Sequence, residues 1–245
     1  SLISKNTNRL HQLMTQLLDF QKADMGKMQL LTREKNIIHY LKERITLFQP
    51  LAKEQSIDLK FESQLKNLLL YYDTDKMDRI VYNLLSNALK YTLENGQVTV
   101  LVTEENNECI IQFKDTGIGI AAKQQKEIFK RYTRVRNAVN YQITGSGVGL
   151  MLTYKLVKLQ KGKIELESKE GKGSTFTLHF PMGKAHLSED EILVSDVKED
   201  KTPLQNKLDK FAIFLTKMVL GMVIIVFVLG LLYGHPVKEM FATAV

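Results

Sequence analysis

The chain has 245 residues, enough for one large or two small domains, and 44% of them are hydrophobic, as in ordinary folded proteins. Its formal net charge of +7 permits anionic partners such as a nucleotide, an acidic protein face or a membrane surface. Nucleic acid is the weaker interpretation, because the lysines are scattered and no zinc-finger, helix-turn-helix or RNP pattern occurs. The one cysteine, Cys109, excludes a disulfide framework and fits a reducing compartment.

The first 24 residues are predicted to form a helix, because leucines and Phe20 recur at three- and four-residue steps, and Gly26 would end it. Alternation and apolar spacing then predict a strand over 28–35, a helix over 36–56, and strands over 57–63 and 67–73.

A helix predicted over 75–92 carries the first group of polar residues. Asn83 and Asn87 are four residues apart, so they lie above one another on one face. An amide oxygen is a hard ligand suited to Mg²⁺, and Lys90, next to Tyr91, could supply charge for a phosphate. The alternative is an amphipathic helix with two solvated amides.

Residues 97–115 are predicted to form a hairpin that turns near Asn106 and Asn107 and ends at Asp115. A carboxylate there can accept a hydrogen bond from an exocyclic amine such as adenine N6. Gly117 and Gly119 would let the backbone approach a flat ligand, although a plain turn is the alternative.

A short helix is predicted over 123–135, a candidate lid over 136–147, and two strands over 163–181. A plain surface loop is the alternative to the lid. Gly145, Gly147 and Gly149 stand before an apolar run, where backbone N–H groups and a helix N-terminus could meet phosphates. The segment lacks the Lys-Ser/Thr ending of a Walker loop.

The order of these motifs is more specific than any one of them. NLLSNALKYT resembles the N box of sensor histidine kinases, DTGIGI their G1 box, EIFKRYTRV their F box and TGSGVGL their G2 box. GKGSTFTLHFP resembles the last strand pair of the same ATP-binding domain, which belongs to a superfamily shared with gyrase, the mismatch-repair ATPase and the heat-shock chaperone ATPase. The resemblance covers about 30–182.

By this resemblance, Asn87 is the magnesium ligand and Asn83 its supporting amide, Lys90 reaches phosphate, and Asp115 reads adenine. Catalysis is assigned to Asn87 and Lys90, and the cofactors are ATP and Mg²⁺. The other residues expected at the nucleotide are Tyr91, Gly117, Gly119, Ile120, Phe129, Tyr132, Thr144, Gly145, Gly147, Gly149, Leu150 and Thr175. Tyr132 stands where F boxes often carry a second Phe.

The N-terminal helix resembles the second helix of the dimerisation bundle of histidine kinases. His11 is not expected to be the phosphoacceptor, because HQLMTQ lacks the acidic residue that follows the histidine in the family's H box. The resemblance implies that the acceptor lies on a first helix outside this chain.

The tail holds an apolar run over 211–233, long enough to span a bilayer at about 1.5 Å per residue, with its Lys207 and Lys210 side cytoplasmic. A buried helix or hairpin is the alternative. KTPLQNKLDKFAIFL also resembles the entry to a membrane helix of P-type cation-transporting ATPases, but their DKTGT motif is absent. A fusion, a misjoined reading frame and a native anchor all stay open.

The expected fold is an α/β two-layer sandwich, one mixed sheet with helices on one face, preceded by a bundle helix and followed by a transmembrane helix. The expected divisions are the partial dimerisation helix (1–29), the ATP-binding domain (30–182), a charged linker (183–210), the membrane helix (211–233) and a tail (234–245).

The expected function is the ATP-binding catalytic portion of a sensor histidine kinase in two-component signalling, a protein-histidine kinase. The expected partners are its parent's acceptor helix, a second copy in a homodimer, a response regulator and the membrane. The domain is expected in the cytoplasm of a bacterium, tethered to the cytoplasmic membrane. The alternatives are a nucleotide-sensing module without transfer activity, a kinase acting on serine and a membrane-transport fragment.

Overall fold

The computed structural model describes residues 27–129 and 147–193, together with Met14, Leu18, Gln21, Lys22, Met25, Thr216 and Met218. The chain divides into two compact units, Ser1–Val194 and Ser195–Val245. All strands and the packed core of the described residues belong to the first unit.

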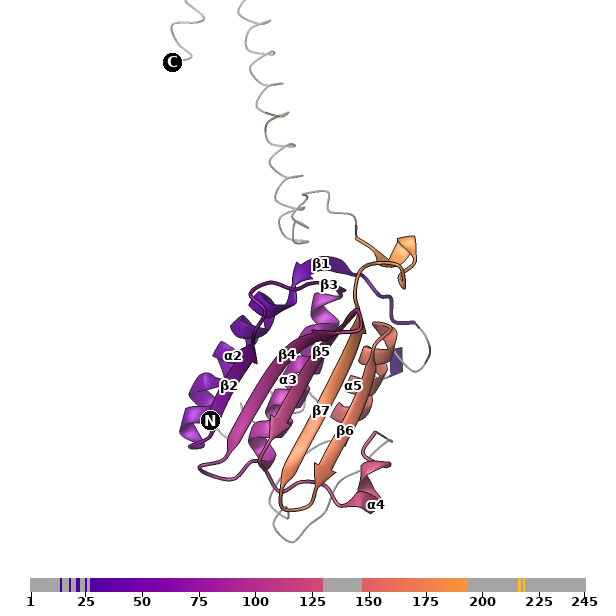
Figure 1. The fold of residues 1–245 in the computed structure, drawn as a ribbon. Helices are drawn as coiled ribbons and strands as arrows, with labels where there is room; N and C mark the ends of the chain where they lie inside the picture. Colours follow the sequence, from indigo (N-terminus) through magenta and orange to yellow (C-terminus); the bar gives the residue numbers. More distant parts are fainter. Residues whose placement is uncertain are drawn as a thin grey trace, which may run out of the picture. The chain divides into compact units, whose positions relative to one another are not determined.

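A five-stranded mixed sheet forms one layer of this unit (Figure 1). Its order is β2-β4-β5-β7-β6, with β2 parallel to β4 and the other neighbours antiparallel. The strands are β2 (Asp58–Ser63), β4 (Gln97–Glu105), β5 (Glu108–Asp115), β6 (Lys163–Lys169) and β7 (Gly173–Pro181). A separate small sheet pairs β1 (Arg33–Asn36) with β3 (Leu69–Tyr72).

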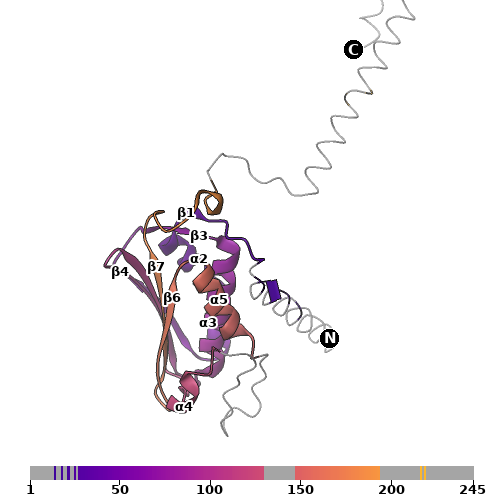
Figure 2. The same ribbon diagram turned by 90° about the vertical axis from the view of Figure 1, so that its right-hand side faces the viewer.

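Three helices form the second layer and lie on one face of the sheet (Figure 2). They are α2 (Ile37–Glu54), α3 (Thr74–Tyr91) and α5 (Gly149–Leu159). Alternate residues of β4 and β5 point at these helices and are fully buried, whereas the intervening residues face the open side. The predicted mixed sheet with helices on one face is therefore confirmed.

Local chemistry explains where the elements begin and turn. The Asn36 side chain caps α2 through the backbone N–H of Ile38 and His39, and Asp73 caps α3 through Lys76 N. Asn106 and Asn107 both adopt positive φ, 51° and 63°, which is the conformation that a two-residue hairpin turn requires. The helices over 36–56 and 75–92 and the hairpin over 97–115 were predictable because each has such a signal.

Two elements are shorter than their patterns predict. Of the strand expected over 28–35, only Arg33 onward joins a sheet, as β1 (Arg33–Asn36), and Thr32 forms an isolated bridge. Of the helix expected over 123–135, the described residues form one turn, α4 (Ala122–Gln125), followed by turn residues up to Phe129, and 130–135 lie outside the described residues. No side chain caps its start, since Ala121 occupies the cap position.

Residues 183–193, expected as the start of a linker, fold back onto the domain. A 3-10 turn, η2 (Glu189–Glu191), precedes a parallel bridge between Ile192 and Thr32. Thr32 N donates to Glu191 O at 2.7 Å, Leu193 N donates to Thr32 O at 2.9 Å, and Lys161 pairs with the Glu191 carboxylate at 2.8 Å. The segment is therefore fastened both to the chain before β1 and to the end of α5.

Most residues of the predicted N-terminal bundle helix and of the predicted membrane helix lie outside the described residues. Of the expected bundle helix, the described Met14, Leu18, Gln21 and Lys22 are helical. Of the apolar run over 211–233, Thr216 and Met218 are helical. Within the part of the chain that the structure describes, no helix is long and apolar enough to cross a membrane.

Candidate nucleotide site

Helix α3 carries four of the predicted site residues on and near its half-buried face. Its apolar side, which includes Leu84, Leu85 and Leu89, is fully buried, so Asn83 and Asn87 are fixed at its margin. No hydrogen bond joins the half-buried Asn87 side chain to the described residues, which leaves its amide able to take a ligand. The Lys90 ammonium lies 4.9 Å from the centre of the Tyr91 ring.

Asn83 has a different role, because its side chain joins α3 to α5. Its Nδ2 donates to the buried Thr153 Oγ1 at 2.7 Å. Its Oδ1 lies so close to Gly149 that a Cβ added there would meet this oxygen at 2.2 Å. The third G2 glycine therefore makes room for an N-box amide, a contact that the sequence pattern did not reveal.

Asp115 ends β5 as a buried carboxylate, 7% exposed. Its Oδ1 accepts hydrogen bonds from the backbone N–H of Gly117 at 2.9 Å and of Ser174 at 3.2 Å. Within the described residues, Oδ2 receives no donor and remains an acceptor for a ligand. Burial raises the pKa of this carboxyl, and the two backbone N–H groups oppose the shift.

The loop after Asp115 is packed against two other backbones. Ile118 N donates to Tyr91 O at 3.1 Å, and Gly171 N donates to Ile118 O at 2.7 Å. At Gly117 an added Cβ would lie 2.2 Å from Tyr91 O, and at Gly119, where φ is +65°, 2.0 Å from Lys169 O. The two glycines permit close contacts within the protein, which join the end of α3 to the β6–β7 turn.

Strand β7 places Ser174, and not the predicted Thr175, beside Asp115. Thr175 pairs with the exposed Lys114, so it faces the open side of the sheet, away from Asp115. Ser174 pairs with Asp115, is buried and donates its backbone N–H to that carboxylate. Strand register decides which of the two residues faces Asp115. Because side chains alternate between the faces of a strand, counting back from the buried Phe176 would have placed Ser174 on the buried face.

The remaining predicted residues divide into two groups. Phe129 packs edge-on against Phe176 and near Tyr154, with ring centres 6.4 and 5.7 Å apart, while Ile120 and Leu150 are partly buried against the core. Gly147 adopts φ of +68° just before α5. The predicted sites Tyr132, Thr144 and Gly145 lie outside the described residues.

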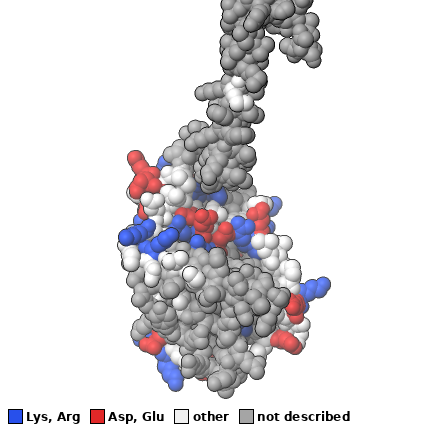
Figure 3. Space-filling view, turned by 180° about the vertical axis from the view of Figure 1, so that it is seen from behind, with Lys and Arg blue, Asp and Glu red and all other residues white. Residues whose placement is uncertain are grey.

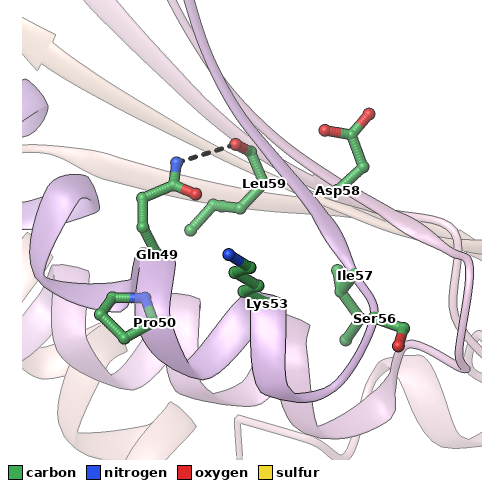
Figure 4. Close-up of a pocket in the computed structure, with 7 residues that line it drawn as sticks. All are labelled: Gln49, Pro50, Lys53, Ser56, Ile57, Asp58 and Leu59. Atoms are coloured by element: carbon green, nitrogen blue, oxygen red, sulfur yellow. Dashed lines mark hydrogen bonds between the residues drawn. The ribbon is translucent and has the colours of Figure 1, made fainter.

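The rest of the described surface offers weaker candidates. On the side seen in Figure 3, the Lys and Arg side chains of the described residues are interspersed with Asp and Glu. An open hollow lies between the end of α2 and β2, where Gln49 Nε2 donates to Leu59 O at 3.0 Å (Figure 4). The hollow is lined by none of the predicted site residues.

Comparisons with known proteins agree with this geometry. Residues 72–184 match the family described as histidine kinase-, DNA gyrase B- and HSP90-like ATPase. The chain is 36% identical over 201 residues to Histidine kinase P4 of Formosa agariphila, which covers 80% of this chain and 14% of that protein. It is 33% identical over 183 residues to Sensor histidine kinase WalK of Bacillus subtilis, covering 74% of this chain and 30% of that protein. The chain thus spans less than a third of either relative.

Two solved structures share the fold. Full-length ShkA in complex with AMPPNP gives a TM-score of 0.65 at 22% identity, covering 73% of this chain and 37% of that one. Histidine kinase ThkA in complex with response regulator protein TrrA gives a TM-score of 0.60 at 20% identity, covering 74% and 50%. With the N-box, G1 and G2 motifs meeting around α3, β5 and α5, the chain contains an ATP-binding domain of the histidine kinase-, DNA gyrase B- and HSP90-like ATPase family, of the kind found in sensor histidine kinases.

Proposed function

We propose that this domain binds Mg·ATP and transfers its γ-phosphoryl group to a histidine on a dimerisation helix outside this chain. The γ-phosphorus would leave the bridging oxygen of ADP and bond to an imidazole nitrogen, from which a response regulator aspartate would take it. The observation that carries the proposal is Asp115: a buried strand-end carboxylate with one oxygen occupied by backbone donors and the other available. Such an acceptor is complementary to an exocyclic amine.

The residues of α3 fit the phosphate side of the same ligand. The half-buried Asn87 amide would hold Mg²⁺, which commonly binds few protein groups plus nucleotide oxygens and supplies charge to the phosphates. Lys90, one turn further along, would orient a phosphate oxygen. This chain's contribution would then be positioning and electrostatics, as is general for phosphoryl transfer.

The wider setting belongs to the same proposal. The domain would work in the bacterial cytoplasm as part of a homodimer, with 211–233 as a membrane tether. Support for the kinase role comes from the names of its relatives, and support for a response regulator as partner comes from the solved complex of ThkA, a protein of similar fold.

The test has two stages. Calorimetry with a non-hydrolysable ATP analogue, with and without Mg²⁺, should give saturable binding that Mg²⁺ strengthens. Transfer to a supplied acceptor-helix domain should then occur with the wild-type chain and be lost in Asn87→Ala. Gln112→Ala, which removes a half-buried amide bonded to Thr177 on the sheet's open side, is the matched control and should transfer normally. Binding without transfer would instead favour a nucleotide-sensing module.

A further inference from the structure

Helix α5 contains one threonine, Thr153, and its hydroxyl bonds across the helix layer to α3. The side chain is 1% exposed, and its Oγ1 accepts from Asn83 Nδ2 at 2.7 Å. A hydroxyl buried this deeply requires a partner, because burying a polar group without a hydrogen bond is unfavourable. The contact is therefore a fixed feature of the α3–α5 interface.

Helix α5 contacts the Asn83 side chain at a second position, Gly149. Gly149 and Thr153 are four residues apart, so they share one face of α5. The Asn83 amide lies over both: its nitrogen bonds to Thr153, and its oxygen fills the space where a Gly149 Cβ would be. Nothing comparable restrains Asn87 among the described residues, although it stands one turn further along α3.

We infer that Thr153 is a positioning residue, whose hydroxyl orients the Asn83 amide and thereby sets the first turn of α5 against the Asn87 end of α3. This inference rests on the proposed function, since it matters only if phosphates and Mg²⁺ lie between these two elements. Thr153 need not touch the nucleotide. Its loss should weaken the phosphate and Mg²⁺ contribution to binding while leaving the adenine contribution, made at Asp115, unchanged.

The experiment compares side chains that differ only in the hydroxyl. Thr153→Val replaces the hydroxyl by a methyl, and the pair Thr153→Ser and Thr153→Ala differs by the oxygen alone. Thr32→Val is the matched control, because Thr32 is also 1% exposed and hydrogen-bonded, but to Glu191 in the η2 turn and not to α3. Calorimetry on the full chain measures affinity for adenosine and for a non-hydrolysable ATP analogue with and without Mg²⁺, and circular dichroism follows thermal unfolding.

We expect the Mg²⁺-dependent gain in analogue affinity to fall about fivefold in Thr153→Val and Thr153→Ala, as the loss of one hydrogen bond implies. Adenosine affinity should stay within twofold, and Thr153→Ser and Thr32→Val should resemble the wild type. If Thr153→Val does not fold, the Ser and Ala pair decides alone.

Equal Mg²⁺ gains in Ser and Ala variants, or a parallel loss of adenosine and analogue affinity, would overturn the positioning role and leave a packing role. Failure of the wild-type chain to bind any nucleotide would overturn the proposed function itself, and this inference with it.

Discussion

Replacing Asp115 by Asn tests the adenine-binding proposal through the geometry of one carboxylate. Oδ1 accepts two backbone N–H groups, from Gly117 and Ser174. An Asn side chain must keep its oxygen there, so its Nδ2 would take the place of Oδ2. The acceptor offered to the ligand thus becomes a donor, and it would face the N6 amino group of adenine, itself a donor.

The expected loss combines a hydrogen bond to a charged group with a donor left unpaired, together about 3 kcal/mol, or on the order of 100-fold in ATP affinity. Guanine presents an acceptor, O6, where adenine has its amino group. The ratio of GTP to ATP affinity should therefore rise in Asp115→Asn. Calorimetry with non-hydrolysable analogues of both nucleotides measures each quantity.

Stability separates this effect from misfolding. Because burial raises the pKa of Asp115 above its ordinary value of 3.8, the folded state binds more protons than the unfolded state between the two values. The free energy of unfolding contributed by this group therefore falls as pH rises through that window. Asp115→Asn, which removes the buried charge, should be no less stable than wild type at pH 7.

Asp115→Ala gives the contrast. It leaves the two backbone N–H donors without an acceptor, so the free energy of unfolding should fall by about 2–4 kcal/mol. Thermal unfolding of both variants at pH 7 checks this order. An Asp115→Asn protein that is folded and binds the ATP analogue within threefold of wild type would refute the adenine assignment.

Three further perturbations probe neighbouring features. Asn87→Ala should leave the melting temperature within about 2 °C of wild type, because the amide has no partner among the described residues. In calorimetry this variant should lose the Mg²⁺-dependent gain in affinity for the ATP analogue. A gain that survives contradicts the role of Asn87 as a Mg²⁺ ligand. Gly149→Ala should cost about 1–3 kcal/mol in denaturant unfolding, because its Cβ would meet Asn83 Oδ1 at 2.2 Å, and an unchanged midpoint would contradict that packing. Glu191→Gln should cost about 0.5 kcal/mol at pH 7, the worth of its partly exposed pair with Lys161. The Lys161 pair holds the pKa of the Glu191 carboxyl below its ordinary value, so the stability that the pair contributes is lost as pH falls through the lowered pKa. A stability difference between Glu191→Gln and wild type that persists in acid would show that the pair is not its cause.

The sequence by itself determined the elements whose signals are local. Helix α3 follows from apolar spacing and the Asp73 cap, and the β4–β5 hairpin follows from alternation and two asparagines at its turn. The motif order likewise identified the ATP-binding domain, because spacing along the chain is a property of the sequence.

Only the tertiary structure decided which residues of distant segments meet. Ser174 rather than Thr175 faces Asp115 because the β5–β7 register fixes the pleat, and a shift of one residue exchanges the two faces. The Asn83–Thr153 bond and the fastening of Glu191 to Thr32 join residues 70 and 159 positions apart. No local pattern encodes such pairs, since they arise when helix packing and strand pairing bring separate parts of the chain together.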